Sequence, residues 1–89
     1  MRDIPAPWYD VAEGEFTFDL AVFDGPISLV VLQEDFRFVG RVDGIEQSVW
    51  PVADELLAGL EPGAVYIAYS EGTVAGQLRR SPSIAFWRH

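Results

Sequence analysis

The chain has no cysteine and no lysine, and its only histidine is the last residue, His89. The lack of cysteine excludes disulfide bonds, thiolate nucleophiles and cysteine-based zinc sites. A nucleophile–base pair needs a histidine or lysine that a third group orients, and a terminal histidine is a poor candidate for that base. Glycine-rich phosphate loops and the spacing of a calcium loop are also missing. We therefore predict no catalytic residue, no cofactor, no metal site and no enzymatic activity.

Long apolar runs are missing as well. The longest stretch without charge or glycine covers residues 26–33, far short of the roughly 20 residues that span a bilayer. The first residues carry prolines and a tryptophan in place of the apolar core of a signal peptide. We expect no membrane contact and no secretion through a signal peptide. The expected location is the virion if the chain comes from a phage, and the cytoplasm otherwise.

The sequence is short and acidic. Its 89 residues are 49% hydrophobic and include six phenylalanines, which is enough for the core of one small domain. The net charge of −8 disfavours direct nucleic-acid binding, because such binding depends on cationic contacts with phosphates. All acidic residues lie between Asp3 and Glu71, whereas Arg79, Arg80 and Arg88 follow them. This separation allows head-to-tail docking with copies of this chain or with an acidic neighbour; a solvated surface that keeps the domain soluble is the alternative.

Short segments of alternating apolar and polar residues, separated by turn residues, predict a mainly β fold. The predicted strands cover residues 15–22, 27–32, 36–42, 45–49, 65–69, 73–80 and 83–87. Apolar residues at four-residue spacing predict one short helix near 52–58, which Gly59 ends. These elements fit a small antiparallel β-sandwich or a partly open barrel. Prolines mark residues 1–9 as an extended N-terminal arm, and residues 10–89 form a single sandwich domain.

The same alternation assigns residues to faces and turns. Residues 27–32 are apolar on both faces, which is typical of a central strand. Asp43-Gly44 predicts a hairpin turn, and Glu71-Gly72 predicts a turn between two later strands. Side chains at strand spacing are predicted to point into the core: Phe16, Phe18, Leu20 and Val22 from the first strand, and Phe36, Phe38 and Val42 from the third.

Aromatic residues at the ends of elements are candidates for an interface with another protein chain. Tryptophan and tyrosine bury a large area and keep a polar group, so they often anchor such contacts. The last strand and the arginines around it form the predicted exposed edge, and edge strands invite pairing with another chain. The candidate interface residues are Trp8, Tyr9, Trp50, Arg79, Arg80, Trp87 and Arg88. Packing of these aromatic residues on their own domain is the alternative.

Three passages resemble the N-terminal immunoglobulin-like domain of phage baseplate upper and tail-fibre proteins. They are Asp24–Leu29 (DGPISL), Asp54–Tyr66 (DELLAGLEPGAVY) and Gly72–Leu78 (GTVAGQL). The resemblance covers residues 13 to 80. It implies an immunoglobulin-like sandwich with a structural role in the virion, as a module that attaches one tail component to another.

Two functions follow from the sequence. The first is a non-enzymatic assembly module of a phage tail or baseplate that binds other protein chains, copies of itself included. The alternative is a small acidic inhibitor, an anti-defence protein or nucleic-acid mimic, that binds a basic host protein through its carboxylates. The net charge of −8 and the small size suit the alternative, whereas the acids are scattered over several turns.

Overall fold

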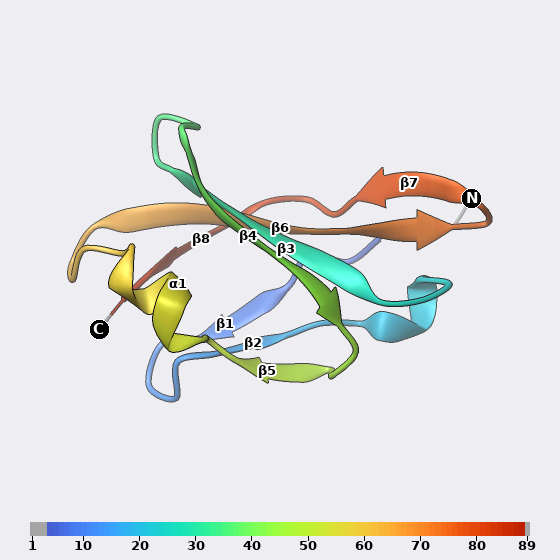
Figure 1. The fold of residues 1–89 in the computed structure, drawn as a ribbon, viewed down its shortest axis with the longest axis horizontal. Helices are drawn as coiled ribbons and strands as arrows, with labels where there is room; N and C mark the ends of the chain where they lie inside the picture. The colour runs from blue at the N-terminus through green and yellow to red at the C-terminus, as the bar shows by residue number, and fades with distance from the viewer. Residues whose placement is uncertain (1–3, 89) are drawn as a thin grey trace.

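Two antiparallel sheets face each other in the computed structural model, which describes residues 4–88 (Figure 1). The smaller sheet has the order β1-β2-β5, and the larger has the order β4-β3-β6-β7, with β8 also paired to β6. The strands are β1 (Trp8–Asp10), β2 (Glu15–Thr17), β3 (Ile27–Gln33), β4 (Phe38–Ile45), β5 (Val49–Pro51), β6 (Val65–Val74), β7 (Gln77–Arg80) and β8 (Ile84–Trp87). A short α-helix, α1 (Asp54–Ala58), and a 3-10 helix, Leu20–Val22, complete this part of the chain. The predicted mainly β sandwich with one short α-helix is confirmed.

The core lies between the two sheets. Side chains of Phe16 on β2, Leu29 on β3 and Phe86 on β8 are almost fully buried, and the rings of Phe16 and Phe86 meet edge-on with centroids 5.0 Å apart. The helix α1 lies at one end of the sandwich (Figure 1), where it buries Leu56. The predicted central strand is confirmed, because β3 pairs with both β4 and β6.

The predicted strand 15–22 is shorter than its alternation suggested. β2 ends at Thr17, and the side chain of Asp19 accepts a hydrogen bond from the backbone N–H of Ala21 at 3.2 Å, which starts the 3-10 helix. This local cap competes with strand pairing for the same backbone groups. Phe18 and Val22 are nevertheless buried, so the apolar pattern was correct about burial and wrong about the length of the strand.

Asp43-Gly44 does not form the predicted hairpin, and no strand returns over residues 45–49. Both residues lie inside β4, where the pairs Leu29–Val42 and Ile27–Ile45 leave two residues of β4 opposite one residue of β3. This is a β-bulge, and Gly44 supplies the positive φ of +73° that it requires. Because a bulge bends its strand, the chain leaves the larger sheet here and forms β5 against β2.

The prediction that Phe36 and Phe38 belong to the core is wrong, because the two residues are 69% and 60% exposed. Phe36 lies in the turn before β4 with a φ of +68°. A second register shift separates the pairs Leu32–Phe38 and Val31–Gly40. One extra residue in a strand exchanges its two faces, and this shift turns Phe38 outward.

Glu71-Gly72 is not a turn. β6 runs through both residues to Val74, and the reversal occurs at Ala75-Gly76, where both φ values are positive.

The predicted boundary between the arm 1–9 and the domain 10–89 falls inside β1, since Trp8–Asp10 pairs with β2. The arm also packs on its own domain, because Ile4 and Pro7 are buried. Residues 1–3 of the predicted arm and His89 lie outside the described residues.

We expect Gly72→Ala to destabilise the domain. A Cβ at this position would lie 2.6 Å from Cδ1 of Phe23 and 3.0 Å from Cγ2 of Ile27, so the core would have to shift. Forcing an extra methyl group into a packed site costs about 1–3 kcal/mol, which urea unfolding measures. The control is Gly25→Ala, where nothing lies within 4 Å of the added Cβ; equal losses from the two variants would contradict the argument.

Candidate functional site

The predicted interface residues do not form one surface. Trp8, Tyr9 and Trp87 come together beside the edges of β1 and β8. Arg80 belongs to a charged network in the larger sheet, and half-buried Arg79 lies next to it on β7. Trp50 and Arg88 make contacts within their own domain. Three of the predicted aromatic residues therefore line one cleft, whereas Trp50 and the arginines lie elsewhere.

An apolar cleft of about 210 Å³ separates the edge strands β1 and β8. Its lining residues are Pro7, Trp8, Tyr9, Val11, Ile84, Ala85, Phe86 and Trp87. Tyr9 and Phe86 stand between the two strands with their ring centroids 5.0 Å apart. Trp8 and Trp87 are 69% and 45% exposed. Large aromatic side chains left in water beside an apolar cleft are typical of a contact surface.

The carboxylates at one end of this cleft have the same sign and lie close in the fold. Asp10 on β1 is directly opposite Glu15 on β2, and Glu13 lies in the turn that joins these strands. The Asp10 carboxylate accepts hydrogen bonds from the backbone N–H groups of Ala12 and Glu13 at 3.0 and 3.2 Å. Like charges directly opposite each other destabilise a pair of strands. A cation from outside would relieve this repulsion.

The pKa of Tyr9 is affected by its burial and by the carboxylate of Asp10. Burial raises the pKa of its hydroxyl, and the neighbouring carboxylate of Asp10 raises it further. The phenol therefore stays protonated over the physiological range and is a hydrogen-bond donor in the lining of the cleft. It offers an orienting group for a ligand and has no nucleophilic character at neutral pH.

Trp50 and Arg88 belong to the architecture of the domain. Trp50 on β5 pairs with Phe16 on β2, is half-buried, and packs on the Phe16 ring with a centroid distance of 6.4 Å. Nη1 of Arg88 donates hydrogen bonds to the carbonyl oxygens of Leu57 and Leu60 at 3.0 and 3.1 Å. Leu57 lies in the last turn of α1, where a cation is favourable, and Leu60 follows the end of the helix. These contacts account for both residues within the domain.

Glu71 is a buried carboxylate held by two arginines. Its Oε1 lies 2.9 Å from Nη2 of Arg41 on β4, and its Oε2 lies 2.8 Å from Nε of Arg80 on β7. The Glu71 side chain is 4% exposed because the two guanidinium groups cover it. Arg41 also pairs with Asp43, whose Oδ1 accepts a hydrogen bond from the hydroxyl of Ser28 at 2.6 Å. The network thus joins β3, β4, β6 and β7 on the outer face of the larger sheet.

The network shifts the titration of its acids. Burial acts to raise the pKa of Glu71, but the hydrogen bonds from Arg80 and Arg41 outweigh it, so the pKa is lowered. The hydrogen bond from Ser28 and then that from Arg41 lower the pKa of Asp43. All these groups pair within the sheet, so the network is suited to holding strands in register and offers no free group for chemistry.

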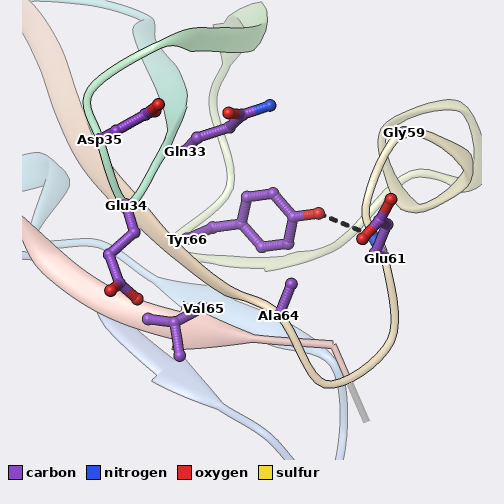
Figure 2. Close-up of a pocket in the computed structure, with 8 residues that line it drawn as sticks. All are labelled: Gln33, Glu34, Asp35, Gly59, Glu61, Ala64, Val65 and Tyr66. Carbon is purple, nitrogen blue, oxygen red and sulfur yellow. Dashed lines mark hydrogen bonds between the residues drawn. The ribbon is translucent and has the colours of Figure 1, made fainter.

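A second, acidic cleft was not predicted as a site. It has a volume of about 460 Å³ and is lined by Gln33, Glu34, Asp35, Gly59, Glu61, Ala64, Val65 and Tyr66 (Figure 2). The Tyr66 hydroxyl accepts a hydrogen bond from the backbone N–H of Glu61 at 2.6 Å. The three carboxylates come from two turns that are far apart in the sequence, so their proximity is set by the fold. They give the cleft a negative potential with no basic residue in its lining.

The outer face of the larger sheet also has an apolar part beside the Glu71 network. Val30 and Leu32 on β3 face Tyr69 and Ile67 on β6, and Val65 on β6 faces Trp87 on β8. Trp87 therefore belongs both to this face and to the cleft.

Within residues 4–88, no group of three or more histidine, aspartate or glutamate side chains is placed to hold a metal ion. No helix of this part of the chain is long and apolar enough to cross a membrane.

We expect Glu71→Gln to lower the stability near pH 6 and to weaken its dependence on acid. A carboxylate whose pKa is lowered by folding stabilises the domain above the unfolded value of about 4.3, and this contribution is lost as the pH falls through the lower folded value. Loss of the charged hydrogen bonds costs about 1–3 kcal/mol. Urea midpoints at pH 6 and pH 3 measure both effects.

Glu46→Gln is the matched control, because it removes an exposed carboxylate in the loop between β4 and β5. We expect it to change the stability at pH 6 by less than about 0.5 kcal/mol. If the Glu71→Gln variant loses as much stability between pH 6 and pH 3 as the unchanged chain, the network does not stabilise the sheet in the way described.

No protein-family model matches the chain, and no curated protein and no solved structure matches it either. The resemblance to the immunoglobulin-like domain of phage baseplate and tail-fibre proteins therefore stays a prediction from three sequence passages.

Proposed function

We propose that the chain is a non-enzymatic assembly module that binds other protein chains through the cleft between β1 and β8. One observation carries the proposal: Trp8 and Trp87 are exposed on either side of an apolar cleft at the free edges of two sheets. Tryptophan in such a place dominates the energy of many protein interfaces. The cleft of about 210 Å³ is smaller than the roughly 300–1,000 Å³ typical of small-molecule sites, which favours a protein ligand.

The surroundings of the cleft agree with a larger contact. Trp87 continues onto the apolar outer face through its neighbour Val65, which is 39% exposed. A stable interface buries on the order of 1,200 Å² or more, which is more than one cleft of this size provides. The partner would therefore cover the cleft and part of the adjoining face. The motif resemblance adds a phage tail or baseplate as the expected assembly, with further copies of this chain among the partners.

We expect the double variant Trp8→Ser/Trp87→Ser to fold and to lose assembly. Neither side chain belongs to the buried core, so the core stays intact, whereas loss of two interface tryptophans weakens binding about tenfold or more. Circular dichroism and urea unfolding check the fold. Co-sedimentation with purified phage particles that lack the chain, and native mass spectrometry for self-association, measure the binding.

Phe36→Asn is the matched control, because Phe36 is also 69% exposed but lies in the turn before β4. Its positive φ suits asparagine, so the fold is expected to be kept. The proposal fails if the double variant assembles as well as the unchanged chain, or if the control loses assembly to the same extent.

The acidic cleft favours a second candidate function, that of an inhibitor of a basic protein. Glu34, Asp35 and Glu61 line a cleft that has no basic residue of its own. We expect the triple variant Glu34→Gln/Asp35→Asn/Glu61→Gln to weaken binding to a basic nuclease. Binding through exposed charges should also vanish by roughly 0.5 M NaCl, where salt screens them. Unchanged binding in the triple variant would exclude this cleft as the inhibitory surface.

A further inference from the structure

The strand edges of this fold differ in how they are protected against pairing. Among the described residues, β8 is paired on one side by β6, and β1 is paired on one side by β2. Natural edge strands are blocked by prolines, charges or bulges. β4 has two register shifts, β5 contains Pro51 and β7 carries Arg79 and Arg80. In contrast, β8 reads Ile-Ala-Phe-Trp and has none of these devices.

The two open edges are oriented alike. Figure 1 shows β1 and β8 running in the same direction, and the contact of the Tyr9 and Phe86 rings keeps them side by side. A single added strand can therefore be antiparallel to both. The backbone N–H and C=O groups along the open edge of β8 can bond to an extended segment, whereas a helix uses its own backbone groups internally.

The side chains around the cleft specify what such a segment carries. A cavity of roughly 150 Å³ holds a benzene ring, so about 210 Å³ accommodates one large apolar side chain between Trp8 and Trp87. Asp10 and Glu15 lie beyond one end of it without an ion-pair partner among the described residues. A lysine or arginine at that end of the segment would remove their mutual repulsion.

We infer that the cleft binds an extended segment of a partner protein, which adds an antiparallel strand to β8 beside β1. The segment places an apolar side chain between the two tryptophans and, toward its own N-terminus, a basic side chain at Asp10 and Glu15. This inference rests on the proposed function and names the chemistry of the partner. The added backbone hydrogen bonds supply affinity, and the alternating side chains supply specificity.

A tethered strand tests the inference with the full chain. A strand of about six residues, beginning with two lysines and continuing with alternating leucine and threonine, is fused after His89 through a flexible linker of about ten Gly and Ser residues. Tethering gives the strand an effective concentration in the millimolar range. We expect slower amide hydrogen exchange in β1 and β8 by roughly tenfold or more, and a higher urea midpoint.

Three matched fusions separate strand addition from other contacts. In the first, glutamates replace the lysines and test the role of the charges of Asp10 and Glu15. In the second, a proline in the middle of the strand tests backbone pairing. In the third, Trp87→Ser tests the apolar contact with the inserted side chain. Each should remove most of the added protection. Unchanged exchange in β8 with the original fusion, or equal protection with the proline fusion, would overturn the inference.

The experiment also distinguishes this inference from the proposed function. If Trp8→Ser/Trp87→Ser abolishes assembly while the fused strand leaves exchange in β8 unchanged, the module binds proteins without strand addition. If the fused strand protects β8 while the double variant assembles normally, the cleft accepts a strand but is not the assembly surface. If an assembly partner slows amide hydrogen exchange in β3 and β6 but not in β8, this also counts against strand addition.

Discussion

The register between β3 and β6 is the constraint on which the rest of the structure depends. Six consecutive pairs, from Ser28–Glu71 to Gln33–Tyr66, fix it. This register places Leu29 and Val31 in the core and Glu71 on the outer face between Arg41 and Arg80. A slip of one residue would exchange the faces, burying a carboxylate among apolar side chains and exposing the core. The network of Glu71, Arg41 and Arg80 and the apolar core therefore both favour this register.

The length of β6 explains why the cleft is open. One edge of β6 is filled by β3, and the other is divided between β8 along its first half and β7 along its second. β8 thus ends the larger sheet on the side where β1 ends the smaller one. The two strands meet through Tyr9 and Phe86 in the core, yet no described backbone hydrogen bond joins them. The cleft is where the sandwich stays open.

Sequence patterns predicted the elements whose residues act locally, and missed those that depend on pairing. The central strand and the short helix are confirmed, because apolar runs and spacing determine them. The two bulges in β4 were not predictable, since Asp43-Gly44 serves a bulge as well as a hairpin and the difference lies in the partner strand. That difference is also why Phe38 is exposed. Similarly, Trp8 and Trp87 stood out as aromatic residues at element ends, whereas the acidic cleft joins two distant turns and left no local signal.

The exposure of the tryptophans is best understood together with the unprotected edge of β8. A small domain of this kind has little stability to spare, and its core is already filled by Phe16, Phe86 and their neighbours. Trp8 and Trp87 lie outside that core. At β8, the apolar edge also lacks the bulges, proline and charges that block β4, β5 and β7. An exposed apolar edge favours aggregation of a solitary protein, whereas a strand from a neighbouring chain would cover it. The proposed assembly function would therefore account for both features.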